Sequence, residues 1–345
     1  MSTTVSFPGL GIEEFSVDRV AFDLFGKPVY WYGVIIMLGI LAAFVHAWLR
    51  CKQEGVSTDD ILDVGIFTVL FGVIGARLYY VLTTLKEYEY DSFIDVIAVW
   101  EGGLAIYGGI IAGTAAIIAT CLYKKLNPFK VTDTIAPGVG LAQAIGRWGN
   151  FMNGEAYGYE VAEGSFLYRF RMGLISDYTG ADMKYYHPTF LYESLWNLVG
   201  FAIITLLYRK KKFNGQVTLM YFTWYGFGRM FIEGLRTDSL YVGPFRISQV
   251  IGLVCFLAGA TLLTIGLVLS YKGKMPAWMQ VSWAASPAVG ETAASVGAAS
   301  VEDGSEGGSV VANADETGAT APGDADEMSD EATDGPSDET PENTN

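Results

Sequence analysis

The chain has 345 residues, 51% of them hydrophobic, and a mean hydropathy of +0.31. This composition is unusual for a soluble enzyme and indicates several membrane spans. The formal net charge of −15 belongs to the C-terminal part, because residues 275–345 contain fifteen Asp and Glu residues and no Lys or Arg, whereas residues 1–274 contain 22 acidic and 22 basic residues. Two histidines and three scattered cysteines exclude a multi-histidine metal site and a cysteine pair with metal-ligand spacing.

The first 28 residues lack the basic, apolar and small-residue pattern of a secretory signal, so we predict insertion through the first span. Residues 1–29 are predicted to form an extracytoplasmic N-terminal segment. Seven apolar segments follow, each close to the length of about 20 residues that a helix needs to cross a bilayer core. They are residues 30–49, 61–84, 104–122, 131–149, 189–207, 216–235 and 247–270. We therefore predict an all-α integral membrane protein with seven transmembrane helices in a domain over residues 30–274.

The basic residues beside the spans predict the orientation of the chain. Eleven of the 22 fall on four short segments on one side, including the run 209–212 after the fifth span. Cytoplasmic loops carry an excess of Lys and Arg, so we place the N-terminus outside and the C-terminus in the cytoplasm. Residues 150–188 are then the longest outer connection and are predicted to form a small extracytoplasmic cap. Residues 275–345, rich in Ala, Gly, Ser, Pro, Asp and Glu, are predicted to be a disordered acidic cytoplasmic tail.

Several ionisable residues lie in the predicted spans or at their ends, where each costs roughly 2.5 to 3.5 kcal/mol on insertion scales. Arg77 and Arg147 lie in the outer parts of the second and fourth spans. Arg229, Glu233 and Arg236 share one helical face near the outer end of the sixth span. Glu233 is either the ion-pair partner of Arg229 or Arg236 or a site residue. Arg77 is either a packing or snorkelling residue or a site residue.

Four arginines at one depth face two or three nearby acids, which leaves excess positive charge and predicts an anionic ligand. The guanidinium fork matches phosphate and does not deprotonate on burial, so the expected ligand is the phosphate of an outer-leaflet phospholipid. The inner halves of the spans carry almost no charge, and Asp133 is expected to be an interfacial helix-start residue. An anion transporter or channel would instead place charges along a path through the membrane, and a structural scaffold would not need this cluster.

Five glycines surround Tyr107 in the stretch EGGLAIYGGIIAG, residues 101–113. Small residues either let helices pack closely or leave room for a lipid chain. Tyr107 is either an anchor in the aromatic belt at the membrane surface or a site residue whose hydroxyl is accessible between the glycines.

The stretch GRWGNFMNGEAYG, residues 146–158, resembles the signature of the prolipoprotein diacylglyceryl transferases of bacterial inner membranes, with every fixed position filled. Five further stretches match in the expected order: WYGVIIMLG (31–39), GARLYYV (75–81), EGGLAIYGG (101–109), HPTFLYES (187–194) and YGFGRMFIEGLR (225–236). The resemblance covers residues 30 to about 269 and leaves out the acidic tail.

The resemblance implies a transferase of the bacterial cytoplasmic (inner) membrane that moves the diacylglyceryl group of phosphatidylglycerol to the lipobox cysteine thiol of a preprolipoprotein signal peptide. A thioether forms and glycerol phosphate leaves, which is the first step of bacterial lipoprotein maturation. The implied partners are phosphatidylglycerol, preprolipoprotein signal peptides and membrane lipids, with no nucleic acid, metal or cofactor. The implied catalytic residues are Arg147, Arg229, Tyr107 and Glu155, and the implied substrate-binding residues are Tyr32, Asn150, Asn153, Glu233 and Arg236.

Tyr107 departs from the family pattern, since many members have histidine at this position. An unperturbed tyrosine has a pKa of about 10, against about 6.5 for histidine, so a phenol is poorly suited to deprotonate a thiol at neutral pH. Tyr107 is instead expected to hydrogen-bond the lipid headgroup or to orient the nucleophile. Glu155 and Glu233 both stay open as the group that accepts the thiol proton.

Overall fold

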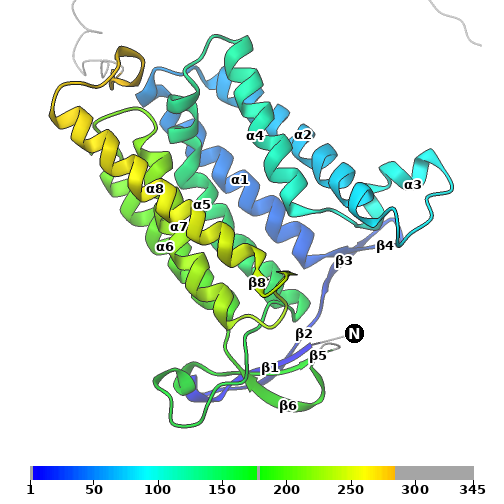
Figure 1. The fold of residues 1–345 in the computed structure, drawn as a ribbon. Helices are drawn as coiled ribbons and strands as arrows, with labels where there is room; N and C mark the ends of the chain where they lie inside the picture. The colour runs from blue at the N-terminus through cyan, green and yellow to red at the C-terminus, as the bar shows by residue number, and fades with distance from the viewer. Residues whose placement is uncertain (1–2, 177–178, 284–345) are drawn as a thin grey trace, which may run out of the picture. The chain divides into compact units, whose positions relative to one another are not determined.

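The computed structural model describes residues 3–176 and 179–283, which fold into a bundle of long helices with a β-sheet at one end (Figure 1). Within this described part, seven helices have 18 or more residues: α1 Trp31–Cys51, α2 Thr58–Thr84, α4 Ile106–Tyr123, α5 Pro128–Asn153, α6 Thr189–Leu207, α7 Gln216–Leu235 and α8 Ile247–Tyr271. Each coincides with one predicted apolar segment, and the short helix α3 (Phe93–Ile97) follows α2. We call the end of the bundle beside the sheet, where α5 and α7 finish, the sheet end, and the opposite end the far end.

Five of the long helices are long and apolar enough to cross a membrane, namely α1, α2, α4, α6 and α8. The other two, α5 and α7, do not meet this standard because they carry polar and charged residues, among them Arg147 in α5 and Arg229 and Glu233 in α7. Both pack against several neighbours: α5 contacts α1, α4, α6 and α7, and α7 contacts α5, α6 and α8. Length and composition therefore identify five spans, and the two polar helices are those whose neighbours cover them.

Glycines allow two helix pairs to approach closely. An added Cβ at Gly108 of α4 would lie 2.3 Å from the carbonyl oxygen of Gly75 in α2, and one at Gly138 of α5 would lie 2.8 Å from that of Ala43 in α1. Small residues permit such contacts between membrane helices. At Gly108, one of the glycines beside Tyr107, close helix packing therefore explains the residue.

The chain is mostly helical but not all-α, because two predicted outer segments form strands. β1 (Thr3–Phe7), β2 (Ile12–Val17), β5 (Met172–Ser176) and β6 (Gly180–Tyr186) make an antiparallel sheet in the order β2-β1-β5-β6. Two hairpins, β3 (Val20–Leu24) with β4 (Lys27–Tyr30) and β7 (Tyr241–Val242) with β8 (Phe245–Arg246), precede α1 and α8.

The four-stranded sheet joins residues that the sequence placed in separate segments, 1–29 and 150–188. Thr4 of β1 pairs with Ile175 of β5, and the buried side chains of Val5 and Leu174 pack in one cluster with Phe190 of α6. Strands this short, with partners this far apart, leave little periodic signal. For this reason the all-α prediction omitted them.

The ordered chain continues beyond the predicted start of the tail. Residues Ala277–Met279 form a 3₁₀ turn, Met275 is buried, and Asn127 Nδ2 donates a hydrogen bond to the carbonyl of Trp278 at 2.7 Å. The predicted boundary at residue 275 is therefore wrong, because apolar side chains of this segment pack on the far end of the helices. The rest of the predicted tail, residues 284–345, lies outside the described residues.

A buried ion cluster at the far end joins α5 to two connections between helices. Lys211 Nζ lies 2.7 Å from Glu54 Oε1 and 3.1 Å from Asp133 Oδ2, and the three side chains are at most 1% exposed. Asp133 also accepts the backbone N–H groups of Gly215 at 2.8 Å and Thr218 at 2.9 Å. Asp133, which was expected at the membrane interface near the start of its helix, is therefore fully buried, whereas Lys211 and Glu54 lie in connections between the spans. The lysine pairs with both acids, and backbone N–H groups stabilise Asp133 further, so the cluster can be buried.

Candidate functional site

Helix α5 ends at Asn153 with Gly154 as its cap, and this ending brings two asparagines and a glutamate together. Gly154 has a left-handed φ of +65°, and an added Cβ would lie 2.8 Å from Thr3 Oγ1 of β1. Glycine is favoured at such a helix end because other side chains rarely adopt this φ. The chain then turns so that Glu155 Oε1 accepts N–H groups from Asn150 Nδ2 at 3.0 Å and Asn153 Nδ2 at 3.2 Å.

Glu193 of α6 connects the two arginines that the sequence singled out in α5 and α7. Its Oε1 lies 2.8 Å from Arg147 Nη2, and its Oε2 lies 2.9 Å from Arg229 Nη1. The Glu193 side chain is 3% exposed. One buried carboxylate therefore fixes both guanidinium groups, and Glu193 is a residue that the sequence patterns did not single out.

The contacts of these arginines form one continuous network. Arg229 Nη2 lies 2.6 Å from Glu233 Oε2, and Arg147 Nη1 donates to Asn150 Oδ1 at 3.2 Å. The network, which we call the arginine network, runs through seven residues: Glu233, Arg229, Glu193, Arg147, Asn150, Glu155 and Asn153. It contains two cationic and three carboxyl side chains, so the predicted excess of positive charge is wrong. Glu193 was not counted, and two of the four arginines lie outside the network.

Arg77 has a structural role, because its side chain holds the connection between α2 and α4. It donates to four backbone carbonyls in the connection between α2 and α4: Asp95 (2.6 Å), Val96 (2.9 Å), Gly102 (2.6 Å) and Gly103 (3.1 Å). The residue is 8% exposed. Of the two interpretations of Arg77, the structure supports the packing one, since buried carbonyl groups require donors.

Arg236 also lies outside the network, directly after α7. Its Nε and Nη2 donate to the two carboxylate oxygens of Asp238 at 2.9 and 2.8 Å. Burial raises the pKa of Asp238, but the paired Arg236 guanidinium outweighs this and holds that pKa below its usual range. Arg246, which the sequence did not single out, donates to the carbonyl of Glu233 and to the hydroxyl of Tyr159 at 2.7 Å.

Tyr32 and Tyr107 approach the site from α1 and α4. The Tyr32 ring packs on α5, where an added Cβ at Gly149 would lie 3.0 Å from Tyr32 Cδ2. The Tyr107 hydroxyl lies 3.2 Å from Ser248 Oγ at the start of α8. The structure thus pairs Tyr107 with a serine that the sequence gave no reason to select.

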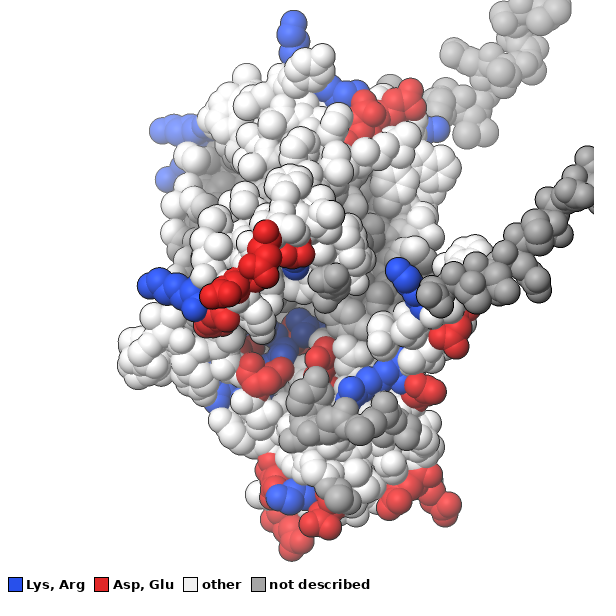
Figure 2. Space-filling view, turned by 90° about the vertical axis from the view of Figure 1, so that its right-hand side faces the viewer, with Lys and Arg blue, Asp and Glu red and all other residues white. Residues whose placement is uncertain are grey.

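The arginine network is buried but not sealed. Arg147 is 20% exposed and Arg229 is 12% exposed. On the face shown in Figure 2, the surface is hollowed between the helices above and the sheet below, and basic and acidic side chains lie at the back of the hollow. Charged groups at this depth are therefore reachable from outside the bundle.

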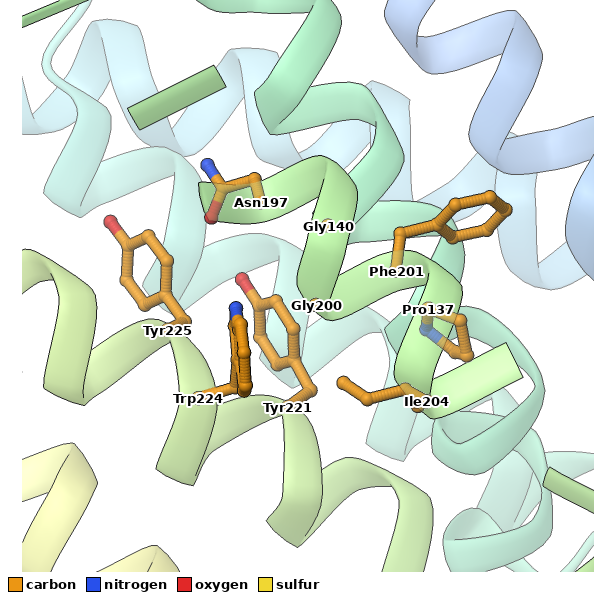
Figure 3. A pocket seen from close by; sticks show the side chains of 9 residues that line it. All are labelled: Pro137, Gly140, Asn197, Gly200, Phe201, Ile204, Tyr221, Trp224 and Tyr225. Atoms are coloured by element: carbon orange, nitrogen blue, oxygen red, sulfur yellow. The ribbon is translucent and has the colours of Figure 1, made fainter. Parts of the chain in front are cut away.

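A small pocket lies between α5, α6 and α7, on the far-end side of the network. It has a volume of about 10 Å³ and is lined by Pro137, Gly140, Asn197, Gly200, Phe201, Ile204, Tyr221, Trp224 and Tyr225. Figure 3 shows the tyrosine hydroxyls pointing from α7 toward α6, which carries Asn197. This volume suffices for about one water molecule, so no substrate fits there. Within residues 3–176 and 179–283, no three His, Cys, Asp or Glu side chains are grouped to hold a metal ion.

The fold and the site together define a multi-pass helical membrane protein with a polar, arginine-containing site inside its bundle. Residues 19–265 match the family model described as "Prolipoprotein diacylglyceryl transferase". The chain is similar to two proteins named phosphatidylglycerol–prolipoprotein diacylglyceryl transferase. It is 42% identical to that of Streptococcus uberis over 245 residues, which cover 70% of this chain and 93% of the relative. It is 41% identical to that of Staphylococcus aureus (strain Newman) over 256 residues, 74% of this chain and 91% of the relative. The chain therefore belongs to the prolipoprotein diacylglyceryl transferase family, and its class of enzyme is a transferase.

The comparisons confirm the resemblance that the signature stretch 146–158 predicted. The structure brings six of the nine predicted site residues into the arginine network, namely Arg147, Asn150, Asn153, Glu155, Arg229 and Glu233. In the described part of the chain, no side-chain hydrogen bond or ion pair joins the other three, Tyr32, Tyr107 and Arg236, to this network. Glu193 could have been found as an isolated acid in an apolar segment of 19 residues.

Proposed function

We propose that this chain transfers the diacylglyceryl group of phosphatidylglycerol to the thiol of a lipobox cysteine in a preprolipoprotein, the first step of lipoprotein maturation. The observation that carries the proposal is the pair of guanidinium groups that Glu193 holds at 2.8 and 2.9 Å inside a bundle of apolar helices. The names of the relatives describe an enzyme that acts on the same two substrates.

The proposed reaction is a displacement at carbon. The thiolate sulfur attacks the glyceryl carbon that bears the phosphate ester, the carbon–oxygen bond breaks, and the electron pair leaves with glycerol phosphate. Negative charge therefore builds on the leaving group, where Arg147 and Arg229 stabilise the transition state more than the ground state. A guanidinium has five N–H donors, so donors remain for the phosphate beside the contacts within the network.

Glu155 is the proposed acceptor of the thiol proton. Its partly exposed carboxylate is held by two amide N–H groups, which fix its position without neutralising its charge. Glu233 is 2% exposed and lies 2.6 Å from Arg229, so we assign it to positioning that arginine. A free thiol has a pKa of about 8.5, and nearby cations favour the thiolate, which reduces the demand on the base. Tyr32, Asn150, Asn153 and Arg236 are proposed to contact or position the substrates.

The Tyr107 hydroxyl is proposed to orient a substrate rather than to accept its proton. Tyr107→Phe is therefore expected to lower kcat/KM by about fivefold, the effect of one hydrogen bond of about 1 kcal/mol. The measurement is steady-state transfer from phosphatidylglycerol to a lipobox peptide. Ser248→Ala, which removes the partner at 3.2 Å, is expected to have an equal or smaller effect. A loss above 100-fold for Tyr107→Phe would place the phenol in the chemical step instead.

We further propose that all seven long helices cross the bacterial cytoplasmic membrane, with the N-terminus outside. Arg209, Lys210 and Lys212 are exposed at the far end, which agrees with the excess of basic residues in cytoplasmic loops. The sheet, with residues 150–188, then forms an extracytoplasmic cap beside the headgroups of the outer leaflet, and the chain after α8 lies in the cytoplasm.

The test is transfer by the purified full chain in phosphatidylglycerol-containing micelles, with a lipobox peptide whose mass is measured before and after incubation. The wild type is expected to add one diacylglyceryl group to the cysteine. Arg147→Ala is expected to lower the rate at least about 100-fold, as loss of a donor to transition-state charge does. Lys184→Ala is the control, since Lys184 is exposed on β6 and contacts only Glu160 at 3.4 Å among the ion pairs of the described chain. Wild-type-like transfer by Arg147→Ala would refute the proposal.

A further inference from the structure

Two tryptophans hold α6 and α7 together through reciprocal contacts. Trp196 Nε1 donates to the carbonyl oxygen of Trp224 at 3.0 Å, and Trp224 Nε1 donates to the carbonyl oxygen of Trp196 at 2.9 Å. The two rings stack with centroids 4.4 Å apart and planes at 17°. Each helix therefore gives the other one indole and one carbonyl in an antiparallel pair.

A glycine four residues after each tryptophan makes this arrangement possible. An added Cβ at Gly200 would lie 2.3 Å from Trp224 Nε1, and one at Gly228 would lie 2.1 Å from Trp196 Nε1. In a helix the carbonyl of residue i already accepts the N–H of residue i+4, so an indole can reach that carbonyl only beside a residue without a side chain. Glycine inside a helix is destabilising relative to alanine. We call Trp196, Trp224, Gly200 and Gly228 together the tryptophan clasp. Its two hydrogen bonds and its stacked rings offset the cost of the two glycines.

The clasp lies within one helical turn of the ion pair that joins α6 to α7. Glu193 is three residues before Trp196, and Arg229 directly follows Gly228. Glu193 Oε2 and Arg229 Nη1 are 2.9 Å apart, so a slide of one helix along the other by even half of the 5.4 Å pitch would separate them. The clasp fixes the position of α6 along α7, which is the register of the two helices, because each indole contacts one carbonyl and one glycine of the other helix.

We propose that Trp196 and Trp224 are positioning residues for the Glu193–Arg229 pair, and through Glu193 for Arg147. This inference rests on the proposed function, because the pair it positions is the one proposed to bind the phosphate. Both tryptophans also line an apolar groove of about 330 Å³, and phenylalanine keeps an aromatic ring on that groove while it removes the N–H donor. Loss of an indole N–H should therefore lower kcat and leave KM for phosphatidylglycerol nearly unchanged.

The test uses Trp196→Phe and Trp224→Phe, which remove the N–H donors and retain aromatic rings, with Trp48→Phe as the control on the exposed face of α1. Each clasp variant is expected to lower kcat about tenfold, because small displacements of a catalytic group have effects of this order, and to change KM less than twofold. In a Glu193→Gln background the same substitutions should have little further effect on kcat. If each clasp substitution lowers kcat in the Glu193→Gln background by the same factor as in the wild type, the assignment is overturned. An increase in KM in place of the loss in kcat would also overturn it.

A second measurement does not depend on activity. The equilibrium constant of unfolding in mixed micelles is measured for Trp196→Phe, Glu193→Gln and the double variant. Coupling through the register predicts that the double variant raises this constant several-fold less than the product of the single effects. Independent effects that multiply would refute the positioning role. An inactive wild type with coupled unfolding would refute the proposed function but retain the clasp as the device that sets the Glu193–Arg229 geometry.

Discussion

Replacing Glu193 with glutamine is expected to lower the rate of diacylglyceryl transfer about 100-fold, the order of effect that a misplaced catalytic group produces. Arg147 and Arg229 lie at different carboxylate oxygens of Glu193, and the amide keeps an acceptor at only one of these two positions. Its NH₂ group would face one of the guanidinium groups. Each arginine keeps another partner, Asn150 or Glu233, and the chain is therefore expected to stay folded. The measurement is kcat for the peptide assay together with thermal unfolding of the purified variant.

Glu160→Gln is the matched control for this prediction. Glu160 is also a glutamate that contacts a cation, but it is 62% exposed and lies 3.4 Å from Lys184. Exposed ion pairs contribute at most about 1 kcal/mol, so transfer by this variant should equal that of the wild type. An active Glu193→Gln variant would mean that the arginines keep their positions without a shared carboxylate.

Replacing Lys211 with methionine is expected to lower the free energy of unfolding by about 3 to 5 kcal/mol, as removal of one partner from a buried ion pair does. Methionine has a similar length but leaves Glu54 and Asp133 buried without a counter-charge. Asp133 would still accept N–H groups from Gly215 and Thr218, whereas Glu54 would lose its ion-pair partner. Unfolding is measured as a function of denaturing detergent.

Lys212→Met is the control, because the neighbouring lysine is exposed. Its free energy of unfolding should change by no more than about 0.5 kcal/mol. Adding Glu54→Gln to Lys211→Met should restore part of the lost stability, since the second substitution removes an unpaired buried charge. Equal stability of Lys211→Met and the wild type would show that the two carboxyl groups are already neutral in the folded chain.

The long helices could be predicted from the sequence because each is an apolar run of bilayer length. Similarly, the match at 146–158 located the end of α5 and four residues of the arginine network: Arg147, Asn150, Asn153 and Glu155. These features depend on neighbours in the chain. Local sequence is enough to specify them.

The partners of the arginines could not be predicted in the same way, because they come from other helices. Arg77 and Arg147 look alike in the sequence, but one donates to backbone carbonyls of a loop and the other contacts Glu193, 46 residues away. Arg229 has one partner four residues away and another 36 residues away. The partner four residues away can be recognised from the spacing along one helix. The distant partner, Glu193, depends on how α5, α6 and α7 pack together.

Strand β1 sits in the middle of the sheet, between β2 and β5, and this has a consequence for biogenesis. The ribosome reaches β5 about 170 residues after β1, which takes roughly 10 to 30 s at ordinary rates of synthesis. During that time the β1–β2 hairpin has an unpaired edge, the kind of edge that templates aggregation. Thr3 of the same strand packs against Gly154. Glu155, which follows that glycine, therefore lies beside a strand whose pairing is complete only after residue 176 has been synthesised.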